Sequence, residues 1–401
     1  GAEPIGPADL QPDPIASWPT LESSALVAEV MKRNPELLSK AHAAHASDAE
    51  IDGARALPPL TLRYAVAPGT LLSDSEAGGH VVSLTQLLPT LGTLDLQNGV
   101  AQRQAESTRA RHAATAQTLA WRARILAEEW SLVHRSLAIH EHHLSLASAL
   151  IERAEASVRA SQGGLQDPIQ AEAVYIDLRQ DGLALQRQLQ VIRSALNRLL
   201  HRAPGAPFPP PEPERDVERL PAVEELFQVA LVNRPELKAK AAQVATAELQ
   251  LDLARRARLP QVGLSVGANT LWGQSTKWMT MGATVSVPSR RGTSAAVEAQ
   301  SARLAEARAA LEAEVDRVME EVERAWHEAN EAIEAAELIG SHLIPVSEER
   351  LAVLLEGYRA GIEPFWLVVD AENALYRAEL RFEELKSRAR VHHVDLAFAP
   401  G

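Results

Sequence analysis

The chain has 401 residues, enough for two or three ordinary domains, and 46% of them are hydrophobic while only 4% are aromatic. Its formal net charge of −13 argues against a nucleic-acid partner, because phosphate binding needs clustered Lys and Arg side chains. The chain has no cysteine, which excludes disulfides, thiol catalysis and cysteine-ligated metal sites. No stretch approaches the roughly 18 uninterrupted apolar residues of a membrane-spanning helix, so none is expected.

The chain contains an internal duplication with a period of 200 residues. Asn34–Leu37 recurs as Arg234–Leu237, and Gly92-Thr93 recurs as Gly292-Thr293. Further matches at the same offset join Ala54-Arg55 to Ala254-Arg255 and Ala171-Glu172 to Ala371-Glu372. The alternative, coincidence in an Ala-rich helical sequence, is less favoured because four anchors share one offset. We therefore divide the chain into an extended N-terminal arm (1–20), a first repeat (21–202), a proline-rich linker (203–221) and a second repeat (222–398).

The two repeats show the same predicted order of elements. In the first repeat we expect a helix over 23–56, strands near 60–68 and 80–88, a long helix over 93–161 and a helix over 168–202. In the second we expect helices within 222–258, broken near Pro235, strands near 261–269 and 278–287, a long helix over 293–359 and a helix over 364–398. A helix as long as 93–161 would extend roughly 100 Å at about 1.5 Å per residue.

The predicted strands alternate between apolar residues on one side and small or polar residues on the other. This pattern over about ten residues is typical of a membrane barrel strand, although a half-buried strand in a soluble sheet would show it too. The aromatic residues suited to a membrane interface are few, namely Tyr64, Trp272 and Trp278. The residues that we predict to face lipid are Leu60, Leu62, Tyr64, Val66, Val262, Leu264, Val266, Met279, Met281 and Val285.

The long helices carry apolar residues at heptad spacing. One such row runs from Leu126 to Val158, a second from Leu185 to Leu199 and a third from Val368 to Leu396. Each repeat is therefore predicted to fold as a coiled-coil hairpin, with turns near 161–167 and 360–364. A hairpin of this length cannot bury its second face within one chain, so we expect neighbouring subunits.

Four short stretches together resemble the TolC-like outer-membrane factors of the outer membrane efflux protein family. Asn34–Leu37 and Arg234–Leu237 resemble the "NPEL" signature of that family, and Val82–Gln86 resembles its strand-to-helix passage. Tyr358–Gly361 followed by Leu367–Glu372 resembles its second turn, and Leu196–Leu200 resembles the end of its first half. The residues of these stretches are most similar to those of the heavy-metal efflux branch. The resemblance covers residues 20–398.

The resemblance implies a mainly α fold of duplicated coiled-coil hairpins that forms an α-barrel, with four strands per subunit. Three subunits would pool these strands into a twelve-stranded transmembrane β-barrel in the outer membrane. This homotrimer would work with a periplasmic adaptor protein and an inner-membrane pump, and would carry metal cations or small toxic compounds outwards. Two alternatives stay open, namely a conduit for type I protein secretion and a soluble periplasmic coiled-coil scaffold.

The predicted turns are candidates for the gate and for adaptor contact. Glycine at these positions permits the positive φ that closes a helical hairpin. Carboxylates there, among them Asp167, Glu363, Asp370 and Glu372, could form rings that favour cations, or could simply stabilise the helices that they begin. Arg159 and Arg359 could tie neighbouring helices together, or stabilise helix ends. The full set of tip candidates is Arg159, Ser161, Gly163, Gly164, Asp167, Arg359, Ala360, Gly361, Glu363 and Asp370.

The sequence offers neither a catalytic nor a cofactor-binding motif. It lacks H-E-x-x-H, a Walker loop and G-x-G-x-x-G. His140, His142 and His143 are close in sequence, but neighbouring residues on a helix point in different directions, so a shared metal ion is disfavoured. We therefore expect no enzyme activity, no cofactor and no resident metal.

Overall fold

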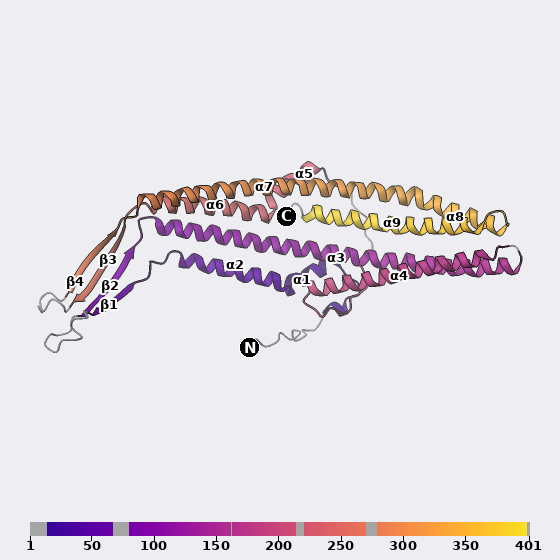
Figure 1. Ribbon diagram of the computed structural model, residues 1–401, viewed down its shortest axis with the longest axis horizontal. Coiled ribbons are helices and arrows are strands. Elements are labelled where there is room, and N and C mark those ends of the chain that lie inside the picture. The colour runs from indigo at the N-terminus through magenta and orange to yellow at the C-terminus, as the bar shows by residue number, and fades with distance from the viewer. Residues whose placement is uncertain (1–13, 67–79, 162, 214–219, 270–278, 399–401) are drawn as a thin grey trace. The chain divides into compact units, whose positions relative to one another are not determined.

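The computed structural model describes residues 14–66, 80–161, 163–213, 220–269 and 279–398, and Figure 1 shows its elements. Each repeat contributes two short helices, two strands and a long helical hairpin. A short 3₁₀ turn precedes them at Pro14–Ser17. The elements of the first repeat are α1 (Ser23–Arg33), α2 (Pro35–Gly53), β1 (Thr61–Val66), β2 (His80–Leu88), α3 (Thr93–Arg159) and α4 (Gln166–Leu199). Those of the second are α5 (Val223–Asn233), α6 (Pro235–Arg256), β3 (Gln261–Asn269), β4 (Met279–Ser286), α7 (Arg290–Leu338), α8 (Ile344–Arg359) and α9 (Phe365–Phe398).

The described chain divides into two compact units, and each unit takes parts of both repeats. One unit comprises Gly1–Leu38, Thr115–Arg234 and Arg317–Gly401, and it holds the hairpin turns. The other comprises Ser39–Ala114 and Pro235–Asp316, and it holds the sheet. Within the described residues, no helix combines the length and apolar character needed to cross a membrane.

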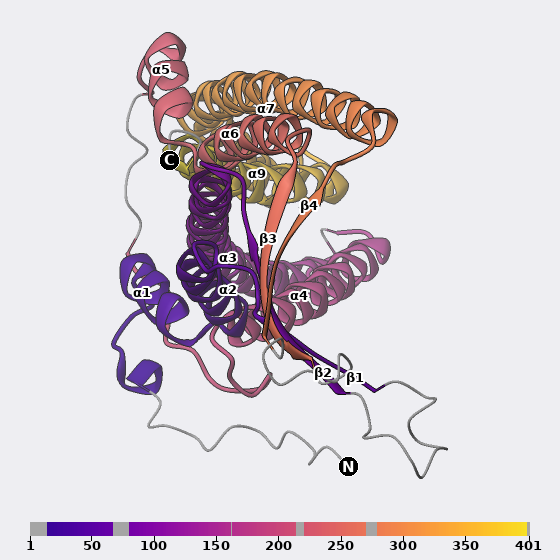
Figure 2. The same ribbon diagram turned by 90° about the vertical axis from the view of Figure 1, so that its left-hand side faces the viewer.

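The four strands form one antiparallel sheet in the order β1-β2-β3-β4, which Figure 2 shows from one end. Strand β2 pairs with β3, so the sheet joins the two repeats. The register aligns Leu62, Leu84, Val266 and Met281 in one row, with Tyr64, Val82, Ala268 and Met279 in the next row on that face. The period-2 alternation therefore places the predicted apolar residues on a single face, except Leu60, which lies one residue before β1. Residues 67, 68 and 278 of the predicted strands, and Trp272 and Trp278, lie outside the described residues.

The first helix of the first repeat is not continuous, which corrects the prediction of one helix over 23–56. Asn34 has an extended backbone between α1 and α2, because a residue before proline is disfavoured in the α region. Its side-chain oxygen accepts the N–H groups of Glu36 and Leu37, at 2.9 and 3.3 Å, and so caps α2. Its amide nitrogen donates to the Leu199 carbonyl at 3.0 Å. The second repeat has the same break at Arg234.

The second long helix is also interrupted, whereas the sequence predicts one helix over 293–359. A π-helical segment, Ile339–Leu343, separates α7 from α8. The physical reason is Pro345, which cannot donate a backbone hydrogen bond and whose ring clashes with the preceding turn of a regular helix. In the first repeat no proline falls within α3, and that helix continues for 67 residues.

The main hydrophobic core of the unit that holds the turns lies where α1, α3 and α4 meet. Its residues include Leu26, Trp130 and Leu196, and the indole nitrogen of Trp130 donates to the Pro209 carbonyl at 3.1 Å. The proline-rich linker therefore packs along this core. Farther along α3, Leu150 and Ala154 pack with Phe365 and Val368 of α9. Most of the predicted heptad positions are buried in these contacts, and the core explains why they are apolar.

Candidate functional site

The two hairpin turns have the same backbone geometry at positions 200 residues apart. Ser161 and Gly361 both adopt positive φ, +57° and +69°. The N–H of Ser161 donates to the Val158 carbonyl and that of Gly361 donates to the Tyr358 carbonyl, each at 3.0 Å. Each turn is then closed by a longer-range bond, from Gly163 N–H to the Ser157 carbonyl and from Glu363 N–H to the Gly357 carbonyl. The left-handed residue after the helix is what ends each helix and turns the chain back.

A hydrogen bond links the two tips to each other. The Tyr358 hydroxyl of α8 donates to Oδ2 of Asp167 in α4 at 3.3 Å, and the Gly164 N–H donates to the same oxygen at 3.1 Å. Asp167 is therefore buried rather than solvated. Burial raises the pKa of the Tyr358 hydroxyl, and the nearby Asp167 carboxylate raises it further, so the hydroxyl keeps its proton and donates.

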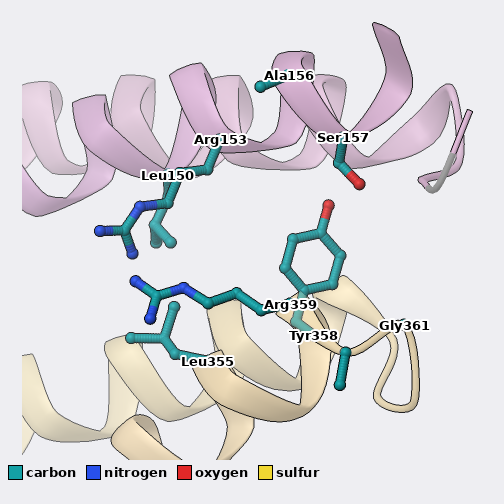
Figure 3. A pocket seen from close by; sticks show the side chains of 9 residues that line it. Leu150, Arg153, Ala156, Ser157, Leu355, Tyr358, Arg359 and Gly361 are labelled. Atoms are coloured by element: carbon teal, nitrogen blue, oxygen red, sulfur yellow. The ribbon is translucent and has the colours of Figure 1, made fainter. Parts of the chain in front are cut away.

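A pocket of about 460 Å³ lies between the ends of α3 and α8. Leu150 and Leu355 supply apolar walls, and the guanidinium groups of Arg153 and Arg359 lie on the same side of the pocket (Figure 3). Arg153 makes no hydrogen bond or ion pair with any residue that the structure describes. Arg359 pairs with Glu356 of its own helix. The pocket thus presents two cationic groups beside an apolar surface.

The remaining tip candidates lie at the same two turns, but most make contacts within their own hairpin. Arg159 pairs with Glu155 one turn earlier at 3.4 Å, so within the chain it does not bridge helices. Asp370 of α9 pairs with Arg350 of α8 at 2.7 Å, and both side chains are well exposed. Glu363 is half-buried, and its side chain covers Gly357, where an added Cβ would lie 2.5 Å from the Glu363 Cγ.

Large apolar side chains are exposed at the tips and along the helices of the hairpins. At the turns these are Leu165, Ile169, Ile362 and Trp366, with Leu165 80% exposed. Along α4, Ile169, Ile176 and Leu183 follow one another at heptad spacing and are all exposed. Along α8, Val346 and Val353 do the same. A coiled-coil seam that remains uncovered in one chain is a surface for further helices.

A charged cluster that the sequence patterns do not predict is buried between α3 and α9. The ring of His143 is completely buried and lies between two carboxylates, with Nδ1 2.6 Å from Glu372 and Nε2 3.0 Å from Glu379. Burial alone would lower the pKa of His143, but the hydrogen bonds and charges of the two glutamates outweigh it and raise the pKa to about 9. Glu372 is only 2% exposed, so the expectation of a solvent-facing carboxylate at this position is wrong.

Further polar contacts continue along the same two helices. Arg135 of α3 pairs with Glu383 at 2.6 Å, and Glu128 pairs with Arg390 at 2.9 Å. His140 instead faces the Tyr376 hydroxyl at 3.3 Å, and burial lowers its pKa. The seam between α3 and α9 is therefore held by charged pairs as well as apolar packing. Among the described residues, no group of three or more His, Cys, Asp or Glu side chains has an arrangement suited to a metal ion.

The apolar face of the sheet is uncovered in the single chain. Leu62, Tyr64 and Met281 are each more than half exposed, as are Leu264, Met279 and Val285. The opposite face carries Thr61, Arg63, Ser83, Thr85, Ser265, Gly267, Thr280 and Gly282. A sheet with an exposed apolar face and a polar opposite face has the two-sided character of membrane barrel strands.

Comparison with known structures identifies this architecture as that of outer-membrane channels. A crystal structure of CusC superposes with a TM-score of 0.84 at 16% identity, covering 100% of this chain and 98% of that chain. The outer-membrane channel OprN gives 0.80 at 18% identity, covering 100% of this chain and 98% of its own. VceC of Vibrio cholerae gives 0.78 at 16% identity, covering 94% of this chain and 96% of that one. At these identities the likeness establishes the fold.

One protein family matches part of the sequence. Residues 226–401, which span the second repeat, match the family described as outer membrane efflux protein. No protein of curated function matches the chain. The family match therefore covers the second repeat, and the fold of the whole chain is similar to that of outer-membrane channels.

Proposed function

We propose that three copies of this chain assemble into one outer-membrane conduit of a tripartite efflux system. The observation that carries the proposal is the pair of uncovered surfaces, the apolar sheet face and the heptad stripes of α4 and α8. Lipid would cover the first and neighbouring subunits would cover the second. Three sheets of four strands would then close into a twelve-stranded barrel, which leaves no strand edge unpaired.

The hairpin tips are the proposed contact for a periplasmic adaptor protein, which would link the channel to an inner-membrane pump. Supporting this, the tips expose Leu165, Ile362 and Trp366, and Arg153 and Arg359 line a pocket near the same turns. Exposed apolar side chains next to cationic groups are typical of a surface that binds another protein. An adaptor segment with apolar side chains next to a carboxylate would be complementary to it.

The same tips are the proposed gate. The Asp167–Tyr358 hydrogen bond joins the first hairpin to the second, so it opposes their separation. Opening the channel requires the tips to move apart, and a weak bond between them can be broken without unfolding either hairpin. The exposed pair of Arg350 and Asp370 lies within the second hairpin, so it does not hold the two hairpins together.

The decisive experiment measures the subunit stoichiometry of the purified protein in detergent and its pore activity after reconstitution. We expect a threefold particle by electron microscopy and discrete conductance steps after reconstitution into planar lipid bilayers. The double variant Ile176→Asp, Leu183→Asp should not form the trimer, because both exposed apolar side chains are replaced by charged ones. The control variant Glu172→Asp on the same helix should form it. A monomer without pore activity would refute the proposed function.

A further inference from the structure

Arg63 of β1 carries the only permanent charge in the four described strands. The strand sequences are TLRYAV, HVVSLTQLL, QVGLSVGAN and MTMGATVS. Every other position in them is apolar, small or uncharged polar, apart from His80. The described residues offer the guanidinium neither a hydrogen bond nor an ion pair. Arg63 is also well exposed.

The register places Arg63 on the polar face of the sheet. Its row contains Ser83 on β2, Gly267 on β3 and Thr280 on β4. The side chains of Ser83 and Thr280 are small, and Gly267 has none. A Cβ added at Gly267 would lie 2.7 Å from the Val82 carbonyl oxygen, so there is no room for a side chain at that position. A long arginine side chain therefore has free space above its neighbours on that face. No acidic side chain in the described strands neutralises it.

The apolar face on the other side of the sheet excludes the opposite orientation in a membrane. An arginine that faces lipid is strongly destabilising, whereas a charge on the lumen side is hydrated and sets selectivity. Resting on the proposed trimeric channel, we propose that Arg63 forms a cationic ring in the lumen of the strand region, which selects for anionic or neutral solutes over bare cations.

This ring acts on the cargo through its electrostatic potential. Three guanidinium groups at one level attract anions and repel cations, as rings of Arg or Lys do in anion-selective pores. The ring opposes the passage of free metal cations, the cargo suggested by the resemblance to the heavy-metal branch. It accommodates organic acids, and metals carried as anionic complexes.

The absence of cysteine from the chain permits a direct test of the potential. Thr280→Cys places a thiol in the row of Arg63 but three strands away, at about 14 Å for strands about 4.8 Å apart. Its reaction rates with an anionic and with a cationic methanethiosulfonate reagent are measured in the reconstituted channel. The measurement is made with Arg63 present and again after Arg63→Gln.

We expect Arg63→Gln to lower the ratio of anionic to cationic rate about threefold in roughly 10 mM salt, and to have no effect in roughly 1 M salt, where charges are screened within a few ångströms. Arg63→Glu should lower the ratio further and shift the reversal potential in a KCl gradient toward cation selectivity. Arg55→Gln, which neutralises an exposed arginine outside the strands, is the matched control and should leave the ratio unchanged.

The outcomes separate this inference from the proposed function. A rate ratio that Arg63→Gln leaves unchanged, or that Arg55→Gln changes equally, would overturn the cationic ring while leaving the channel intact. A reconstituted protein that forms no pores, and whose Thr280→Cys thiol reacts no faster than a Leu84→Cys thiol on the apolar face, would overturn the channel itself.

Discussion

The imidazole of His143 in α3 lies 2.6 Å from the carboxylate of Glu372 in α9, and both side chains are almost completely buried. This pair joins the long helix of the first repeat to the last helix of the second. Removing one carboxylate from this buried cluster is strongly destabilising, because only Glu379 then remains to compensate the charge of His143. The duplication provides an unusual control, since the counterpart of Glu372 in the first repeat, Glu172, is exposed.

We therefore expect Glu372→Gln to lower the free energy of unfolding by about 3 kcal/mol, the lower end of the range for breaking a buried pair. Glu172→Gln should change it by less than about 0.5 kcal/mol, as for an ordinary surface substitution. Denaturant unfolding of the detergent-solubilised protein, followed by circular dichroism at neutral pH, measures both. Equal effects of the two substitutions would show that the contact with His143 contributes nothing.

The stabilisation by His143 should depend on pH. Its pKa is about 9 in the folded chain, above the ordinary value of 6.5, so the folded state binds the proton more tightly than the unfolded state. The stabilisation is therefore fully present below pH 6.5 and is lost as the pH rises through 9. The difference in melting temperature between the natural protein and Glu372→Gln should be largest near about pH 6 and should shrink toward about pH 10. A difference that grows with pH would contradict this assignment.

The hydrogen bond between Tyr358 and Asp167 should oppose opening of the tips. Tyr358→Phe removes the hydroxyl but keeps the ring that packs against Phe365, with ring centroids 5.1 Å apart. Losing one hydrogen bond of about 0.5–1.5 kcal/mol should raise the open fraction roughly two- to tenfold. Single-channel recording in planar bilayers measures that fraction. Tyr175→Phe is the control, because that residue lies on α4 away from the turn, and an equal increase there would remove the gating role of Tyr358.

The turn at Gly361 should need a residue that tolerates positive φ. Nothing lies within 4 Å of an added Cβ there, so the effect of a substitution is conformational rather than steric. Gly361→Ala should lower the free energy of unfolding by about 1–2 kcal/mol, whereas Gly361→Asn should lower it by less, because asparagine adopts this region more readily. Thermal unfolding of the two variants, compared with the natural protein, measures the difference. If Gly361→Ala and Gly361→Asn lower the free energy of unfolding equally, the turn does not depend on the positive φ of residue 361.

Local pattern alone determined much of this fold. Period-2 alternation in the strands, heptad spacing in the helices and the offset of 200 residues are properties of neighbouring residues, and they predict the sheet face, the buried seams and the equivalent turns of Ser161 and Gly361. The break at Asn34 and the π-helical segment before Pro345 were missed although their signal is local, because proline reshapes the residues before it.

Contacts between distant segments were decided only by the tertiary structure. In the sequence Glu372 looks like any carboxylate near the start of a helix, and nothing within its own helix shows that His143, 229 residues away, will lie against it. The same holds for Tyr358 and Asp167, and for the pocket between Arg153 and Arg359. Periodicity fixes which face of a helix is apolar, but the pairing of polar groups depends on which helices pack together and at what register. That choice comes from the packing of the whole unit.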